Sequence, residues 1–233
     1  MKSQLIYLKS LRSQRIVYAL LLLFSLIITA QYTTQEKSFT AMNHILDLLP
    51  MLVGCCTTAA IASFRAEGML YLHLLRYPNR RIVLLQTLGA AVLYASAIMC
   101  TIFFVCFAES CVILLVSNGE AANPQVIFPI AIRFFLLLIA FSAVGAAIGI
   151  IGRTTALSLT LYVSIIWILP IVLVFLSLIR KGLDTFASQY TIVTLSVNFA
   201  FGSFSQAAIA YSYFAIWIGV LAVLAYLGLK SDR

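Results

Sequence analysis

Hydrophobic residues follow one another along this chain in long continuous runs, with short polar stretches between them. Six runs are long enough to be helical membrane spans, and they cover residues 16–33, 45–64, 82–107, 126–151, 156–179 and 207–229. About 20 apolar residues in a helix cross the ~30 Å hydrocarbon core of a bilayer. The runs do not alternate in polarity, as the strands of a membrane barrel do. The pattern therefore predicts an all-α polytopic membrane protein with one transmembrane domain over residues 1–233.

Three features interrupt this simple pattern. Leucines lie between basic residues over residues 2–15, which predicts an N-terminal helix on the membrane surface. Residues 185–206 mix aromatic residues with Ser and Thr, and we expect a pair of short interfacial or re-entrant helices there. Glu109 interrupts the third run before apolar residues resume at Cys111. We therefore expect Glu109 to mark the outer boundary of the third span.

Composition agrees with a membrane protein and excludes several other classes. The chain is 63% hydrophobic and only 9% charged, whereas soluble domains are about 25% charged. Six spans leave no room for a sizeable soluble domain. The five cysteines lie in or beside apolar runs without any C-x-x-C spacing. We interpret them as small buried hydrophobic residues rather than as a disulfide framework or a metal site.

The net charge of +8 is distributed in a way that indicates orientation. Lys and Arg are enriched in the cytoplasmic loops of membrane proteins. With six spans, one side of the membrane receives most of the cations, namely Lys2, Lys9, Arg12, Arg15, Arg65, Arg76, Arg80, Arg81, Arg153, Lys230 and Arg233. The other side receives only Lys37, Arg133, Arg180 and Lys181. We therefore expect both termini, and the segment between the second and third spans, to be cytoplasmic.

That cytoplasmic segment, EGMLYLHLLRYPNRR over residues 67–81, has more apolar residues than a simple topology loop needs. Leucine side chains left in water cost roughly 1.5–3 kcal/mol each, so we expect them to be covered by other helices or by a partner. Pro78 disfavours helical geometry at Tyr77, which predicts a helix over residues 65–77. Asn79 is then a suitable N-cap for the third span. A topology loop without a partner is the alternative interpretation.

The segment resembles the loop between the second and third spans of type-2 ABC exporter permeases. A basic residue, Glu-Gly, an apolar run with paired leucines, Pro and Arg occur here in the family's order. The matching residues are Arg65, Glu67, Gly68, Leu70, Leu74, Leu75, Pro78 and Arg81. The layout of six spans, an N-terminal interfacial helix and short helices before the last span is also similar to that family. In such permeases this loop forms a coupling helix that docks on a separate ATP-binding subunit.

This resemblance implies that the chain is the membrane-spanning permease of an ATP-driven exporter. Two permease chains, the same or homologous, would assemble with two ATPase subunits in a bacterial plasma membrane. Arg65 and Arg76 would supply polar contacts to the ATPase, and Leu70, Leu74 and Leu75 the apolar contacts. The chain has no G-x-x-x-x-G-K-[ST] sequence, so we expect no enzymatic activity in it. ATP and Mg²⁺ would bind in the partner subunit.

Other candidate residues lie within or beside the spans. Glu109 and Arg133 could pair between the third and fourth spans, contact a substrate or extend separately to the outer interface. Gly145, Gly149 and Gly152 form a small-residue stripe that permits close helix packing, either within this chain or between two chains. No catalytic or metal-binding set is evident.

The substrate class is suggested only by the scarcity of charged groups in the spans. An ion or sugar pathway would be expected to contain more intramembrane polar groups, so we expect an amphiphile such as a peptide, a drug or a lipid. Two alternative functions do not involve an ATPase. One is a secondary carrier or channel, and the other is a membrane scaffold without transport activity.

Overall fold

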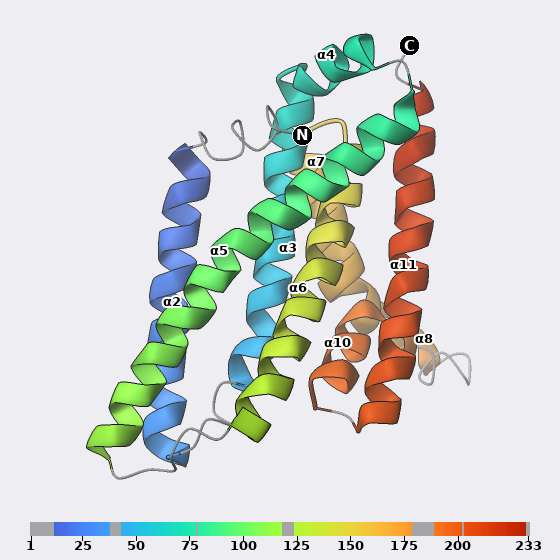
Figure 1. The fold of residues 1–233 in the computed structure, drawn as a ribbon. Coiled ribbons are helices and arrows are strands. Elements are labelled where there is room, and N and C mark those ends of the chain that lie inside the picture. Colours follow the sequence, from blue (N-terminus) through green and yellow to red (C-terminus); the bar gives the residue numbers. More distant parts are fainter. Residues whose placement is uncertain are drawn as a thin grey trace.

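A computed structural model of the chain describes residues 12–37, 43–77, 79–117, 124–178, 189–201 and 203–231. Within those ranges every regular element is a helix and no strand is present. Six helical segments are long and apolar enough to span a membrane. They lie beside one another as an elongated bundle (Figure 1). The predicted all-α architecture with six candidate membrane spans is therefore confirmed for the described residues.

The observed helices agree closely with the predicted runs. The first two spans belong to α2 (Arg12–Glu36) and α3 (Asn43–Ala66), and the next two to α5 (Arg80–Val116) and α6 (Pro124–Ile151). The fifth span consists of α7 (Thr155–Val163), the π-helix η2 (Ser164–Ile168) and α8 (Leu169–Ser177). The last span is α11 (Phe204–Ser231). Two short helices, α4 (Met69–Arg76) and α10 (Ile192–Phe201), lie between spans.

The centre of the bundle is the contact between α3 and α6, which is the most extensive contact between any two helices described. Small residues let these backbones approach closely. A Cβ atom added at Gly145 of α6 would collide with the carbonyl group of Gly54 in α3. A Cβ added at Gly149 would lie 2.9 Å from the Thr58 carbonyl oxygen. Gly145 and Gly149 of the small-residue stripe thus pack against α3 of the same chain, whereas Gly152 lies against Ser158 of α7.

Tyr162 of α7 also packs against α3 at this centre. Its ring is almost completely buried, and its hydroxyl donates a hydrogen bond of 2.7 Å to the Met51 carbonyl oxygen of α3. A Cβ at Gly54 would collide with the same hydroxyl group. Gly54 therefore accommodates both α6 and α7, and the fifth span begins firmly attached to the core.

The helix of the third span continues beyond Glu109, the residue predicted to mark the outer boundary of the span. α5 runs without a break to Val116. At 1.5 Å per residue, the 37 residues of α5 extend to roughly 55 Å, well beyond the ~30 Å of a bilayer core. Figure 1 shows α5 running obliquely across the bundle from the end near α11 to the end near α2. This tilt accommodates much of the excess length, and a carboxylate on the helix surface does not break backbone hydrogen bonds.

The fifth span contains a local irregularity at its middle. The π-helical turn at Ser164–Ile168 is followed by Leu169 and then Pro170. Proline has no N–H and its ring collides with the carbonyl four residues earlier in an α-helix, so a widened turn at this point relieves the conflict. Beyond it, α8 contains no buried residue. Its apolar surface is suited to lipid.

The mixed segment over residues 185–206 is mostly helical where the structure describes it. The ten-residue helix α10 is only about 15 Å long, too short to cross a bilayer. It packs mainly against α11, and Trp217 of α11 donates a hydrogen bond of 3.0 Å to the Tyr190 carbonyl oxygen. In Figure 1, α10 lies at the end of the bundle opposite α4.

The short helices α4 and α10, which connect successive spans, lie at opposite ends of the bundle (Figure 1). The Arg12 end of α2, the helix α4, the turn between α6 and α7, and the Ser231 end of α11 lie at one end (Figure 1). Most of the described cations belong to these elements or to the ends of α3 and α5 next to α4, whereas Lys37 follows the last residue of α2, at its opposite end. The predicted N-terminal interfacial helix falls mostly in residues 1–11, which lie outside the described ranges. From Arg12 onward the chain already forms the continuous helix α2.

Candidate functional site

The segment that connects the second and third spans folds as the short helix α4, held between two sharp turns. Gly68 adopts a left-handed conformation with φ of 74°, which is accessible to glycine at little cost. This turn separates α3 from α4. At the other end, Tyr77 is extended, as predicted from the following proline. Asn79 then caps α5 by accepting a 3.1 Å hydrogen bond from the Arg81 N–H, and this prediction is also confirmed.

The two faces of α4 differ in exposure. Leu70 is only 2% exposed, and His73, Leu74 and Tyr77 are half-buried against the bundle. These four residues have the i, i+3, i+4, i+7 spacing of one helical face. The opposite face exposes Met69, Tyr71, Leu72, Leu75 and Arg76. Both faces contain apolar residues, but the bundle covers only one of them.

His73 is central to the covered face. Its ring lies 5.7 Å from the Phe64 ring of α3 and stacks on Tyr77 at 6.5 Å between centroids. Partial burial, together with the nearby Arg76 guanidinium, lowers the pKa of His73 below its usual value. The neutral form of the imidazole therefore favours the packing of α4 against the bundle, which is its docked position.

Two arginines link this region to the ends of other spans. Arg65, in the last turn of α3, donates to the carbonyl oxygen of Ile150 and, at 3.3 Å, to that of Ile151, at the end of α6. Arg80, at the start of α5, donates to the Leu229 carbonyl oxygen near the end of α11. The last carbonyl groups of a helix have no partner within the helix and carry partial negative charge. Each arginine therefore caps a helix while connecting two spans.

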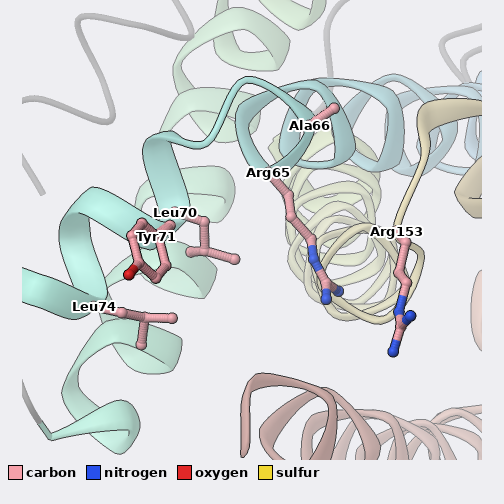
Figure 2. Close-up of a pocket in the computed structure, with 6 residues that line it drawn as sticks. All are labelled: Arg65, Ala66, Leu70, Tyr71, Leu74 and Arg153. Carbon is pink, nitrogen blue, oxygen red and sulfur yellow. The ribbon is translucent and has the colours of Figure 1, made fainter. Parts of the chain in front are cut away.

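A pocket of about 310 Å³ lies beside α4. Figure 2 shows Arg65 and Arg153 extending in the same direction on one side of it, with Leu70, Tyr71 and Leu74 of α4 on the other. Arg153 belongs to the short turn between α6 and α7 and is exposed. The pocket thus combines two guanidinium groups with an apolar wall.

The structure brings most of the predicted coupling residues together but gives them unequal positions. Leu75 and Arg76 are exposed, whereas Leu70 and Leu74 face the bundle. Arg65 points toward α6 rather than away from the molecule. Glu67 and Gly68 form the turn before α4, and Arg81 is exposed in the first turn of α5. Pro78 lies outside the described residues.

Sequence reasoning missed three residues of this region. Tyr71 and Leu72 are exposed on α4, each by 58%, and Arg153 lines the pocket. For the helix, the signal was available in the spacing, because the buried positions 70, 74 and 77 follow one helical face. For Arg153, no local signal exists, because its proximity to Arg65 depends on how α3 packs against α6.

The other predicted polar residues lie away from this site. Glu109 projects from α5, and one of its carboxylate oxygens is buried without a hydrogen-bond partner. Arg133 lies on α6. No ion pair joins the two within the described part of the chain. The described residues also contain no group of three or more His, Cys, Asp or Glu side chains able to hold a metal ion.

Comparison with known proteins leaves the function to be argued from these features. No protein-family model matches the sequence, and no curated protein is significantly similar to it.

Proposed function

We propose that this chain is the membrane-spanning permease subunit of an ATP-driven ABC exporter, and that α4 is its coupling helix. The observation that carries the proposal is the exposed apolar face of α4. Leu72 and Leu75 are 58% and 64% exposed, although α4 lies outside the membrane spans. Leaving such side chains in water costs about 1.5–3 kcal/mol each, so a partner subunit that covers them gains that free energy.

The connections of α4 suit a helix that transmits movement. It is joined through the chain to α3 and α5, and Leu70 packs it into the core. Arg65 and Arg80 extend the connection to the ends of α6 and α11. A displacement of α4 by a partner therefore acts on four of the six spans. This is the mechanical role that an ATPase-driven permease requires.

In this proposal, two ATPase subunits bind ATP and Mg²⁺ and act on two permease chains, the same or homologous. The exposed Tyr71, Leu72, Leu75 and Arg76 form the docking face on each chain. The positive charge at the α4 end makes that end cytoplasmic, where ATP is available, and the membrane is a bacterial plasma membrane. The sparsely charged spans favour an amphiphilic substrate, namely a peptide, a drug or a lipid.

The test is co-purification in mild detergent with any ATP-binding-cassette ATPase that is encoded beside this chain. We expect the wild-type chain to retain the ATPase and a Leu72→Glu/Leu75→Glu double variant to lose at least nine-tenths of it, because burial of two leucines contributes about 3 kcal/mol or more, which is a roughly hundredfold or larger change in affinity. Lys230→Glu is the matched control, because Lys230 is exposed at the same end of the bundle. Size-exclusion profiles verify that each variant is folded.

Either of two results would contradict the proposal. If no such ATPase binds the wild-type chain, α4 is not a coupling helix. The function is then one of the alternatives, namely a carrier, a channel or a scaffold. If the double variant retains the ATPase as well as the control does, the ATPase docks elsewhere.

A further inference from the structure

We infer that the pocket beside α4 binds the phosphate group of an anionic ligand at the membrane surface, and that the headgroup of an anionic phospholipid supplies it. The proposal goes beyond the coupling role of α4. It concerns the side of α4 that carries Leu70 and Leu74, whereas the proposed ATPase contacts centre on Leu72 and Leu75, and Tyr71 borders both sites. The two sites can be tested apart through residues that belong to only one of them.

The charge of the pocket is the first argument. Arg65 and Arg153 both line it, and none of the residues that line it is acidic. Arg65 is held in place by the carbonyl groups at the end of α6, so its guanidinium is oriented before a ligand arrives. Arginine pairs well with phosphate because its planar group presents several N–H donors at once. Two such groups at one pocket favour an anion with several oxygen acceptors.

The level of the pocket in the membrane is the second argument. Arg65 lies at the end of the span Leu49–Ala66, and Arg153 follows the span Ile127–Ile151 by two residues. Both guanidinium groups therefore lie where the apolar spans end, which is the level of lipid headgroups. Basic pockets between spans at the cytoplasmic surface are typical sites for anionic headgroups.

The opposite wall supports an amphiphilic ligand rather than a fully hydrophilic one. Leu70 and Leu74 contribute apolar surface, and Tyr71 adds a phenol. A phosphate held by the arginines places the glycerol and upper acyl carbons of a lipid within reach of these side chains. An inorganic phosphate ion would use only the charged side of the pocket.

The experiment is native mass spectrometry of the purified full chain, titrated separately with phosphatidylglycerol, phosphatidylcholine and inorganic phosphate. We expect the wild-type chain to bind phosphatidylglycerol more tightly than phosphatidylcholine. Arg153→Gln is the test variant, because Arg65 also holds the end of α6 and its loss would disturb the fold. The expected effect of Arg153→Gln is a roughly tenfold weaker affinity for phosphatidylglycerol, from the loss of one charge-assisted contact.

Two control variants make this result specific. Lys230→Gln removes the same charge at the same end of the bundle, away from the pocket, and should bind phosphatidylglycerol as the wild type does. Arg153→Lys keeps the charge and should restore a large part of the affinity, which also verifies that the site folds without the arginine.

The outcomes separate the sources of the phosphate. If inorganic phosphate binds the wild type but not Arg153→Gln, while the two lipids bind equally, the pocket takes phosphate from solution, and the assignment to a lipid is wrong. If Arg153→Gln binds phosphatidylglycerol as tightly as the wild type and Lys230→Gln do, the pocket is not a phosphate site. Neither outcome depends on whether an ATPase binds α4.

Discussion

Gly54 shows how much of this fold depends on the absence of a side chain at single positions. It lies on α3 where α6 approaches from one side and the Tyr162 hydroxyl from another. Without a strong hydrophobic effect between helices in lipid, close van der Waals packing supplies much of the stability of a helix pair. A glycine at such a contact has a packing function, and its conformational freedom is irrelevant within the helix.

The first prediction concerns Gly145, whose added Cβ would collide with the backbone of Gly54. A backbone atom cannot rotate away, so Gly145→Ala must separate α3 from α6. Overpacking of this kind costs about 1–3 kcal/mol, and we expect a lower thermal unfolding temperature in detergent.

Gly219→Ala is the matched control, because nothing lies within 4 Å of a Cβ added there. It should leave the unfolding temperature unchanged or raise it slightly, since alanine is about 1 kcal/mol more favourable than glycine within a helix. Equal unfolding temperatures for both variants would contradict the close contact of α3 and α6.

At the scale of an element, α4 is a short helix whose form depends on its contacts with the bundle. It has only eight residues, and isolated helices of that length are not stable in water. Its helical form therefore depends on Leu70 and on the half-buried His73 and Leu74. The neutral state of His73 is part of that attachment.

The second prediction follows from the lowered pKa of His73. An unfolded histidine has a pKa of about 6.5, so at lower pH the released helix binds a proton more readily than the docked helix does. By linkage, the docked state of α4 is fully favoured above that pH and loses stability as the pH falls toward the lowered pKa.

Hydrogen exchange of the α4 amides, corrected for the intrinsic effect of pH, measures this change. Protection should decrease between pH 7 and pH 5 in the wild-type chain. His73→Phe keeps an aromatic ring between Phe64 and Tyr77 without a titratable group, so its protection should be nearly independent of pH. The same pH dependence in both chains would exclude His73 as the cause.

At the scale of the whole molecule, the distribution of charge and the position of the short helices give the bundle two different ends. The α4 end carries Arg65, Arg80, Arg81, Arg153 and Lys230. The opposite end has α10 and a smaller pocket of about 220 Å³ lined by neutral polar and apolar residues, among them Tyr190, Asn198 and Gln206. The bias of positive charge predicts that the α4 end is cytoplasmic.

The third prediction tests this orientation with membrane-impermeant thiol labelling in a chain whose five cysteines are replaced by alanine. Leu72→Cys on α4 should react only in inside-out vesicles, whereas Ser203→Cys, in the turn before α11, should react in intact cells. Both positions are exposed. Labelling of Leu72→Cys in intact cells would reverse the orientation and also exclude docking of a cytoplasmic ATPase on α4.

The sequence by itself determined the elements of this protein. Continuous apolar runs can be satisfied in a bilayer only as helices, so the six candidate spans were readable without a fold. The C-terminal end of α4 was readable too, because the proline after Tyr77 and the amide of Asn79 act through neighbouring backbone groups. Its start was not, because the helix predicted over residues 65–77 is divided by the left-handed turn at Gly68, so that Arg65 belongs to α3. The continuation of α5 past Glu109 was not, because one carboxylate on a helix surface leaves the backbone ladder intact and a tilt accommodates the added length.

Only the tertiary structure decided which residues meet across the bundle. The spacing of Gly145 and Gly149 indicated close packing, but Gly54 as the partner depends on the register between α3 and α6. That same register brings Arg153 beside Arg65. The two are far apart in the sequence, because Arg153 follows Gly152, which is 87 positions from Arg65. Local patterns determine secondary structure because they act within a few residues. Sites formed between spans depend on packing over long sequence separations, which a local pattern does not specify.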